Sequence, residues 1–132
     1  MRTPHKLGRV QLQIMQSLWE RGQATAREIT DALNRTQPIA HSTVQTLLRK
    51  LEAKGAVTHD PADRVFVFRP VYQEAEVSTS AAHDLLTRVF GGSVYGLVAH
   101  LLAHEHVPPD ELTRLRALLD AEGQSEGDDD AR

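Results

Sequence analysis

HSTVQTLLRKLEAKG, residues 41–55, places an apolar stripe and a polar stripe along one short segment. The apolar side chains recur at three- and four-residue spacing, which is the period of a helix: Val44, Leu47, Leu48 and Leu51. Gly55 follows where such a helix would end. The other side carries small hydroxyls and an amide first, and cations further along. We therefore expect an amphipathic helix with one face in a core and the other turned toward a polar surface.

Two further helices are predicted before this one. Apolar residues at helical spacing predict a helix over residues 8–21, which Gly22 ends. Thr25 stands three residues before Glu28, the pattern of a capping box, so a short second helix is expected over residues 26–35.

After Gly55 the pattern changes to short β-branched and aromatic runs. AVTH and VFVFRP flank the turn signal DPADR, which predicts a β-hairpin that ends at Pro70. Three helices followed by a hairpin, within residues 1–72, is the order of a winged helix-turn-helix. The expected fold class is therefore mainly α, with a winged helix-turn-helix in the first half.

The second half is expected to be helical and to form a dimerisation domain over residues 73–121. Its apolar positions fall on three amphipathic helices: Val77, Leu85, Val89, Phe90, Leu97, Val98, Leu101, Leu102, Leu112, Leu115 and Leu119. Three short helices bury too little surface to be stable alone. A second copy of the chain is the simplest partner, so we predict a homodimer. Residues 122–132 have no apolar face and are predicted to be a disordered acidic tail.

The net charge of −3 hides an uneven distribution. Residues 1–72 carry eleven Lys and Arg against six Asp and Glu, whereas residues 73–132 carry four against twelve. A basic half beside an acidic remainder indicates a polyanionic partner for the first half.

Several function classes have no support in the sequence. There is no cysteine, and no Gly-rich phosphate loop or nucleophile-elbow motif is present. We expect no enzyme activity, no cofactor and no resident metal. No secretory signal or long apolar span is present, so a cytoplasmic protein without membrane insertion is expected.

The polar face of residues 41–55 fits the major groove of double-stranded DNA. Hydroxyls and an amide can contact base edges there, and cations further along can contact phosphates. The predicted DNA contacts, including one cation at the hairpin tip, are Ser42, Thr43, Gln45, Thr46, Arg49, Lys50, Lys54 and Arg64. Two alternatives are an ordinary solvated helix face and a winged helix that binds a protein instead of a specific DNA sequence.

At these residues the chain resembles the penicillinase-repressor (BlaI/MecI) family of bacterial transcriptional regulators. The similar segments are LGRVQLQIMQSLWERGQATAREITDALN, STVQTLLRKLEAKGAV, RVFVFRPV and LLTRVFGGSVYGLVAHLLAHEHVPPDELTRLRALL. Their order and spacing extend the resemblance to about Ala121. It implies a winged-helix DNA-binding domain joined to a helical dimerisation domain, and a homodimer that represses transcription at a dyad-symmetric operator, in a β-lactam or related stress response.

The resemblance also implies an upstream sensor or protease that lifts repression by cutting the repressor. In the best-known members the cut falls at an Asn-Phe step. The matching positions here are His100 and Leu101, so the cut motif is absent.

His100 and His104 are four residues apart and would share one helix face. The plain interpretation is a pair of polar surface residues. The alternative is a metal-responsive or pH-responsive repressor that uses these two imidazoles.

Overall fold

The computed structural model describes residues 7–62 and 64–130. It divides into two compact units, Met1–Leu85 and Leu86–Arg132. Within the described residues the fold is mainly α, with six helices and one three-stranded sheet.

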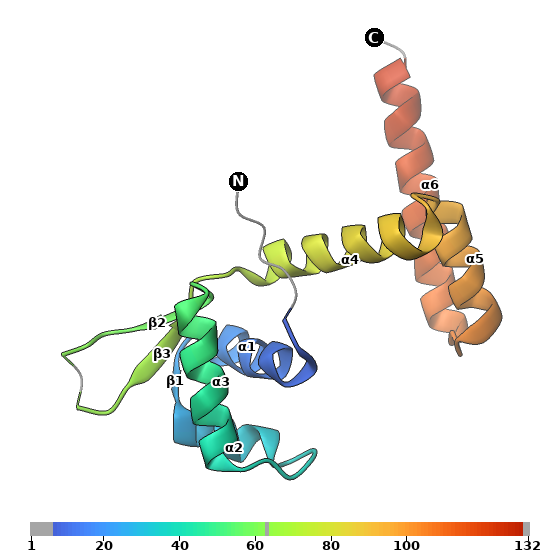
Figure 1. Cartoon of the computed structure of the whole chain (residues 1–132). Coiled ribbons are helices and arrows are strands. Elements are labelled where there is room, and N and C mark those ends of the chain that lie inside the picture. The colour runs from blue at the N-terminus through green and yellow to red at the C-terminus, as the bar shows by residue number, and fades with distance from the viewer. Residues whose placement is uncertain (1–6, 63, 131–132) are drawn as a thin grey trace. The chain divides into compact units, whose positions relative to one another are not determined.

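The first unit contains three helices, three short strands and most of a fourth helix. In chain order these are α1 (Arg9–Arg21), β1 (Ala24–Thr25), α2 (Ala26–Leu33), α3 (His41–Ala53), β2 (Val57–His59), β3 (Val67–Pro70) and α4 (Glu74–Phe90). The sheet is antiparallel in the order β1–β3–β2, with His59 opposite Phe68. Figure 1 shows the loop between β2 and β3 extending away from α1, α2 and α3, as the wing of a winged helix does.

One core joins all of these elements except α4. It is built from one face of each helix and from the sheet: Ile14, Met15, Leu18, Ala24, Ile29, Leu33, Val44, Leu48, Leu51, Ala56, Val57 and Phe68. The apolar stripes that predicted the helices are the surfaces that meet here. The predicted order of three helices and a hairpin is confirmed.

Two details of the first unit differ from the prediction. The second helix ends at Leu33 instead of residue 35, because Asn34 caps it with its side-chain amide on the Thr30 and Ile39 carbonyls. The strand β1 was not predicted. It has only two residues, and they form a strand because they pair with β3. This pairing joins segments that are far apart in the sequence, so no local sequence pattern predicts it.

The capping box at the start of α2 has the predicted geometry. The backbone N–H of Glu28 donates to Thr25 Oγ1 at 3.1 Å, and the Thr25 N–H donates to the Glu28 carboxylate at 2.8 Å. The hydrogen bond from the Thr25 backbone, with that from its side chain, lowers the pKa of Glu28 below its ordinary value. The charged form of Glu28 therefore stabilises the folded state.

Glu28→Gln is expected to make the stability of the first unit less dependent on pH in acid. Because the folded-state pKa is lowered, the stabilisation by the carboxylate is complete above the ordinary pKa of 4.5 and is lost as the pH falls through the folded-state pKa. Urea unfolding followed by the fluorescence of Trp19, the single tryptophan, measures this. The free energy of unfolding of the wild type should be larger than that of the variant at neutral pH, and the two values should converge in acid. A difference that stays constant with pH would contradict the role of the charge.

The second unit holds the end of α4, then α5 (Val94–His104) and α6 (Pro109–Asp130). Gly91 and Gly92 turn the chain with φ of +57° and +84°, which favour glycine. The Ser93 hydroxyl then accepts from the Gly96 N–H at 2.9 Å and caps α5.

The structure differs from the prediction of a disordered tail, since α6 continues to Asp130. Residues 131–132 lie outside the described part of the chain. Residues 121, 122 and 124 are good helix formers, whereas Gly123 and Gly127 in the same segment are poor ones. Extending an existing helix nevertheless costs far less than starting one. The absence of an apolar face therefore did not end the helix.

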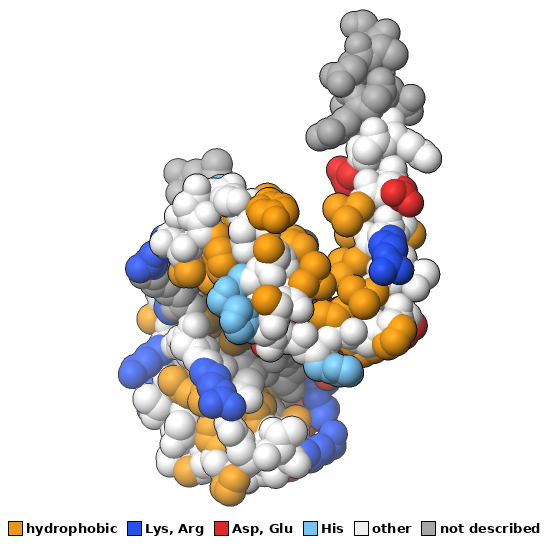
Figure 2. Space-filling view, turned by 90° about the vertical axis from the view of Figure 1, so that its right-hand side faces the viewer, with side chains coloured by type: hydrophobic (Ala, Val, Ile, Leu, Met, Phe, Trp, Pro, Cys, Tyr) orange, Lys and Arg blue, Asp and Glu red, His pale blue; other side chains and the backbone are white. Residues whose placement is uncertain are grey.

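Large apolar side chains remain uncovered in the second unit. No residue between 86 and 124, the part for which burial is described, is buried. Figure 2 shows hydrophobic side chains gathered over α5 and α6. The exposed large apolar residues of this unit are Val89, Val94, Tyr95, Val98, Leu101, Leu102, Leu118 and Leu119.

A helix that spans a membrane has to be long and apolar. Among the described residues no single helix is long and apolar enough to cross a membrane, although the bent pair α4 and α5 has the required length and composition when the two are taken together.

Candidate nucleic-acid interface

Helix α3 presents the predicted polar face to solvent. Val44, Leu48 and Leu51 are buried in the core. All eight side chains predicted to contact DNA are exposed: Ser42, Thr43, Gln45, Thr46, Arg49, Lys50, Lys54 and Arg64. The first six lie on α3, Lys54 is its C-terminal cap residue, and Arg64 lies in the loop of the wing. The structure thus places six of the eight on one helix whose back is fixed by the core.

The connection from α2 to α3 is fixed by hydrogen bonds. Asn34 Nδ2 donates to the Ile39 carbonyl at 2.9 Å, and the Ile39 N–H donates to Asn34 Oδ1 at 3.2 Å. Thr30 Oγ1 donates to the Ala26 carbonyl at 2.8 Å and lies 3.0 Å from His41 Nδ1. The Thr30 hydroxyl thereby links the start of α2 to the first residue of α3. These bonds set the direction in which α3 begins.

The wing is attached to the far end of α3. His59 Nδ1 on β2 lies 2.5 Å from Glu52 Oε2 on α3. The His59 ring stacks on Phe66 with centroids 3.9 Å apart, and also contacts Phe68. A loop that would otherwise vary in position is thereby coupled to α3.

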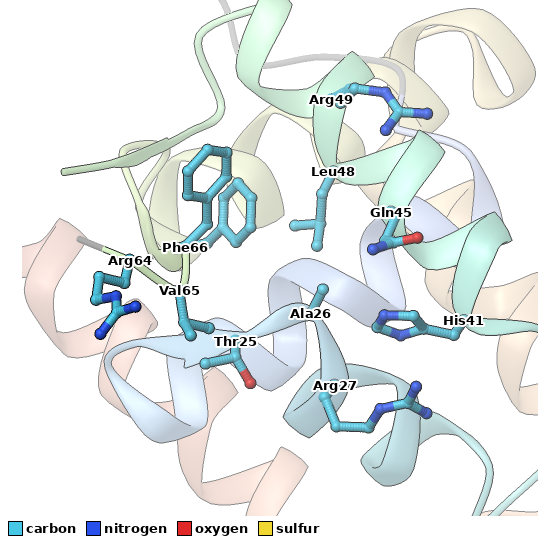
Figure 3. Close-up of a pocket in the computed structure, with 11 residues that line it drawn as sticks. Thr25, Ala26, Arg27, His41, Gln45, Leu48, Arg49, Arg64, Val65 and Phe66 are labelled. Atoms are coloured by element: carbon cyan, nitrogen blue, oxygen red, sulfur yellow. The ribbon is translucent and has the colours of Figure 1, made fainter. Parts of the chain in front are cut away.

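A pocket of about 380 Å³ opens between α3, the start of α2 and the wing (Figure 3). Its lining residues are Thr25, Ala26, Arg27, His41, Gln45, Leu48, Arg49, Arg64, Val65, Phe66 and Phe68. The sequence predicted three of these as DNA contacts, Gln45, Arg49 and Arg64. It missed Arg27, Val65 and Phe66, because they approach α3 only through tertiary contacts and no local pattern identifies them.

The two histidines of α5 do not form a site by themselves. The rings of His100 and His104 stack with centroids 4.2 Å apart, and His104 Nδ1 donates to the His100 carbonyl at 2.9 Å. Within the described residues, no group of three or more His, Cys, Asp or Glu side chains could hold a metal ion.

The residues predicted for dimerisation differ in exposure. Val77 is 8% exposed, so the chain itself covers it and it is not on the surface. Phe90, Leu97, Leu112 and Leu115 are partly covered. The exposed members are Leu85, Val89, Val98, Leu101, Leu102 and Leu119. The sequence pattern could not separate Val77 from the others because all of them share the helical period.

Comparisons with known proteins cover most of the chain. The family model described as "Penicillinase repressor" matches residues 7–121. The penicillinase repressor of Bacillus licheniformis is 27% identical over 110 residues, which are 83% of this chain and 86% of the relative. The transcriptional regulator BlaI of Mycobacterium tuberculosis is 30% identical over 116 residues, 86% of this chain and 83% of the relative. The solution structure of the DNA-binding domain of the repressor BlaI matches with a TM-score of 0.50 and 29% identity, over 58% of this chain and 93% of that structure.

Proposed function

The chain belongs to the penicillinase repressor family of DNA-binding transcriptional repressors, which is not an enzyme family, and from this we propose that it represses transcription as a homodimer on a dyad-symmetric operator. In this proposal residues 1–72 bind DNA, residues 73–121 dimerise, and one α3 from each copy enters a major groove. The protein then acts in the cytoplasm, where bacterial operators lie.

The observation that carries the proposal is that α3 has one side buried in the core and the other side exposed. Three of the four residues in its apolar stripe are in the core, with Val44 and Leu51 at 0% exposure, so the helix cannot rotate about its axis and its other side stays exposed. That face offers Ser42, Gln45 and Thr46 where a docked helix would meet base edges. Arg49 and Lys50 follow one turn later, where phosphates would lie. A helix fixed in this way is preorganised for a groove.

The second unit supports the homodimer. Burial of its exposed apolar side chains, which include Leu101, Leu102 and Leu119, would stabilise the dimer by about 25 cal/mol for each Å² of apolar surface removed from water. A closed twofold dimer lets the same patch cover itself in both copies. Two DNA-binding units held together make the second half-site contact nearly intramolecular, so dimerisation supplies affinity without new base contacts.

An upstream sensor or protease remains part of the proposal through the family resemblance. The positions of the family's cut, His100 and Leu101, lie exposed on α5 but lack the Asn-Phe step. We therefore propose control through the dimer, because any agent that separates the two copies lowers operator affinity.

The test is selection of bound sequences from a random duplex library, followed by titration of the selected duplex against salt. A DNA-binding repressor should enrich a sequence with twofold symmetry. Its affinity should fall log-linearly with salt concentration, with a slope set by the phosphates it contacts. No enrichment together with a flat salt response would favour the alternative of a protein-interaction module.

Gln45→Ala is expected to relax sequence preference at one base pair of each half-site. Gln can bond an adenine through two hydrogen bonds, so the discrimination removed there is about 1–3 kcal/mol. Competition between the selected duplex and its single-base variants measures this. Equal losses on every sequence would contradict a base-reading role.

Lys50→Ala is expected to weaken binding to all duplexes alike. A lysine on a phosphate carries no sequence information, and its removal should reduce the salt slope by about 1 for each phosphate that it neutralises. Binding isotherms on selected and random duplexes at several salt concentrations provide the measurement. A loss confined to the selected sequence would exclude the phosphate role.

A further inference from the structure

The pocket between α3, the start of α2 and the wing has an apolar floor and wall. Leu48 and Phe68 are buried, whereas Val65 and Phe66 are 64% and 50% exposed beside it. Its volume of about 380 Å³ lies in the range of small-molecule sites, roughly 300–1,000 Å³. Exposed apolar side chains around a concave surface favour a ligand with an apolar body.

The polar groups around this pocket are cationic or neutral. Arg27, Arg49 and Arg64 line it together with His41 and Gln45, and no carboxylate is among its lining residues. Figure 3 shows His41 and Arg27 on one side and Phe66 on the other. Arg64 lies on the Phe66 side, so a ligand whose apolar body lies against Phe66 would also have the cationic Arg27, beside His41, opposite it. An arginine matches a carboxylate in charge and in hydrogen-bond geometry.

The imidazole beside Arg27 is fixed before any ligand arrives. His41 Nδ1 is held 3.0 Å from Thr30 Oγ1, and Thr30 is 3% exposed and bonded to the Ala26 carbonyl. A side chain that is already ordered loses little entropy on binding.

We propose that this pocket binds a small organic anion, with a planar apolar body against Phe66 and a carboxylate toward Arg27 and His41, and that its occupancy weakens DNA binding. This inference rests on the proposed function, because Gln45 and Arg49 belong both to the pocket and to the proposed DNA contacts. A bound anion would occupy the space between α3 and the wing, and would set a negative charge where phosphates approach. It would thus act as an inducer by direct competition.

The binding test uses 2-naphthoate and its neutral counterpart 2-naphthamide on the ¹⁵N-labelled full chain, without DNA. Naphthoate should shift the backbone amide signals of Gln45, Leu48 and Phe66. Naphthamide should bind about tenfold more weakly because it lacks the charge that arginine recognises.

Arg27→Gln should weaken naphthoate binding by about tenfold. Arg35→Gln, which removes an exposed arginine that does not line the pocket, should leave naphthoate affinity unchanged. Equal binding of acid and amide, or shifts that avoid these residues, would overturn the site.

The second arm measures binding of the selected duplex with and without naphthoate. Saturating naphthoate should lower duplex affinity in the wild type, and the decrease should be smaller in Arg27→Gln at the same naphthoate concentration, each protein being compared with its own ligand-free affinity. Naphthoate bound in the pocket with unchanged duplex affinity would overturn the competition. Failure to bind any duplex before ligand is added would instead refute the proposed function, and the naphthoate titration alone would still decide whether the pocket is a site.

Discussion

Leu101→Glu should give a monomer with operator affinity reduced by about 100-fold or more. Leu101 lies on α5 and is 44% exposed, within the apolar surface that the second unit does not cover. A carboxylate buried in an apolar interface without a partner is strongly unfavourable, so the two copies should separate. The second half-site contact then loses its high effective concentration, although no DNA-contacting residue has changed.

Sedimentation equilibrium and binding to the selected duplex measure the two effects of this substitution. Ala99→Glu introduces the same charge on the same helix, about 200° away around its axis, and should remain dimeric with normal affinity. Because Leu101 is already partly exposed, the variant should keep its helical circular dichroism. A Leu101→Glu protein that remains dimeric would place the interface elsewhere, and a monomer with unchanged affinity would contradict the role of dimerisation.

Leu51→Ala is expected to destabilise the first unit by about 2–5 kcal/mol. Leu51 is 0% exposed and packs in the core that holds α3 against α1, α2 and the sheet. The truncation loses the transfer free energy of the side chain and leaves a cavity that the surrounding elements fill only in part. A small domain has only about 5–15 kcal/mol of stability, so a large share is lost, and with it the fixed presentation of α3.

Urea unfolding at fixed protein concentration measures the effect of Leu51→Ala, with Trp19 fluorescence as the signal. Trp19 reports on the first unit because it packs against this core and its indole N–H donates to the Tyr72 carbonyl at 2.9 Å. Lys50→Ala, the adjacent residue on the exposed face, should change stability by less than about 0.5 kcal/mol. Similar losses of stability in both variants would contradict the placement of Leu51 on the core face and Lys50 on the exposed face of α3.

The sequence predicted what depends on local periodicity. Val44, Leu48 and Leu51 share a helix face, and that face is the one in the core. Thr25 and Glu28 stand at capping-box spacing, and both hydrogen bonds are present. Such features depend on a few neighbouring residues, so they can be recognised in the sequence before the fold is known.

What the sequence could not predict depends on contacts between distant segments. The pocket combines Arg27, His41 and Phe66 from α2, α3 and the wing, and their proximity is set by the packing of all three. Val77 has the same helical spacing as the apolar residues predicted for dimerisation, yet it is covered by the chain itself. Helical period identifies which residues share a face, but burial of that face is decided by what lies opposite.

Titration of the ¹⁵N-labelled protein with the selected duplex locates the DNA-binding surface residue by residue, and so tests directly whether α3 and the wing bind DNA. The largest chemical-shift changes should fall on the backbone amides of residues 42–50 and of Arg64. Changes confined to α5 and α6, with the amides of α3 unaffected by bound duplex, would contradict binding through α3 and the wing.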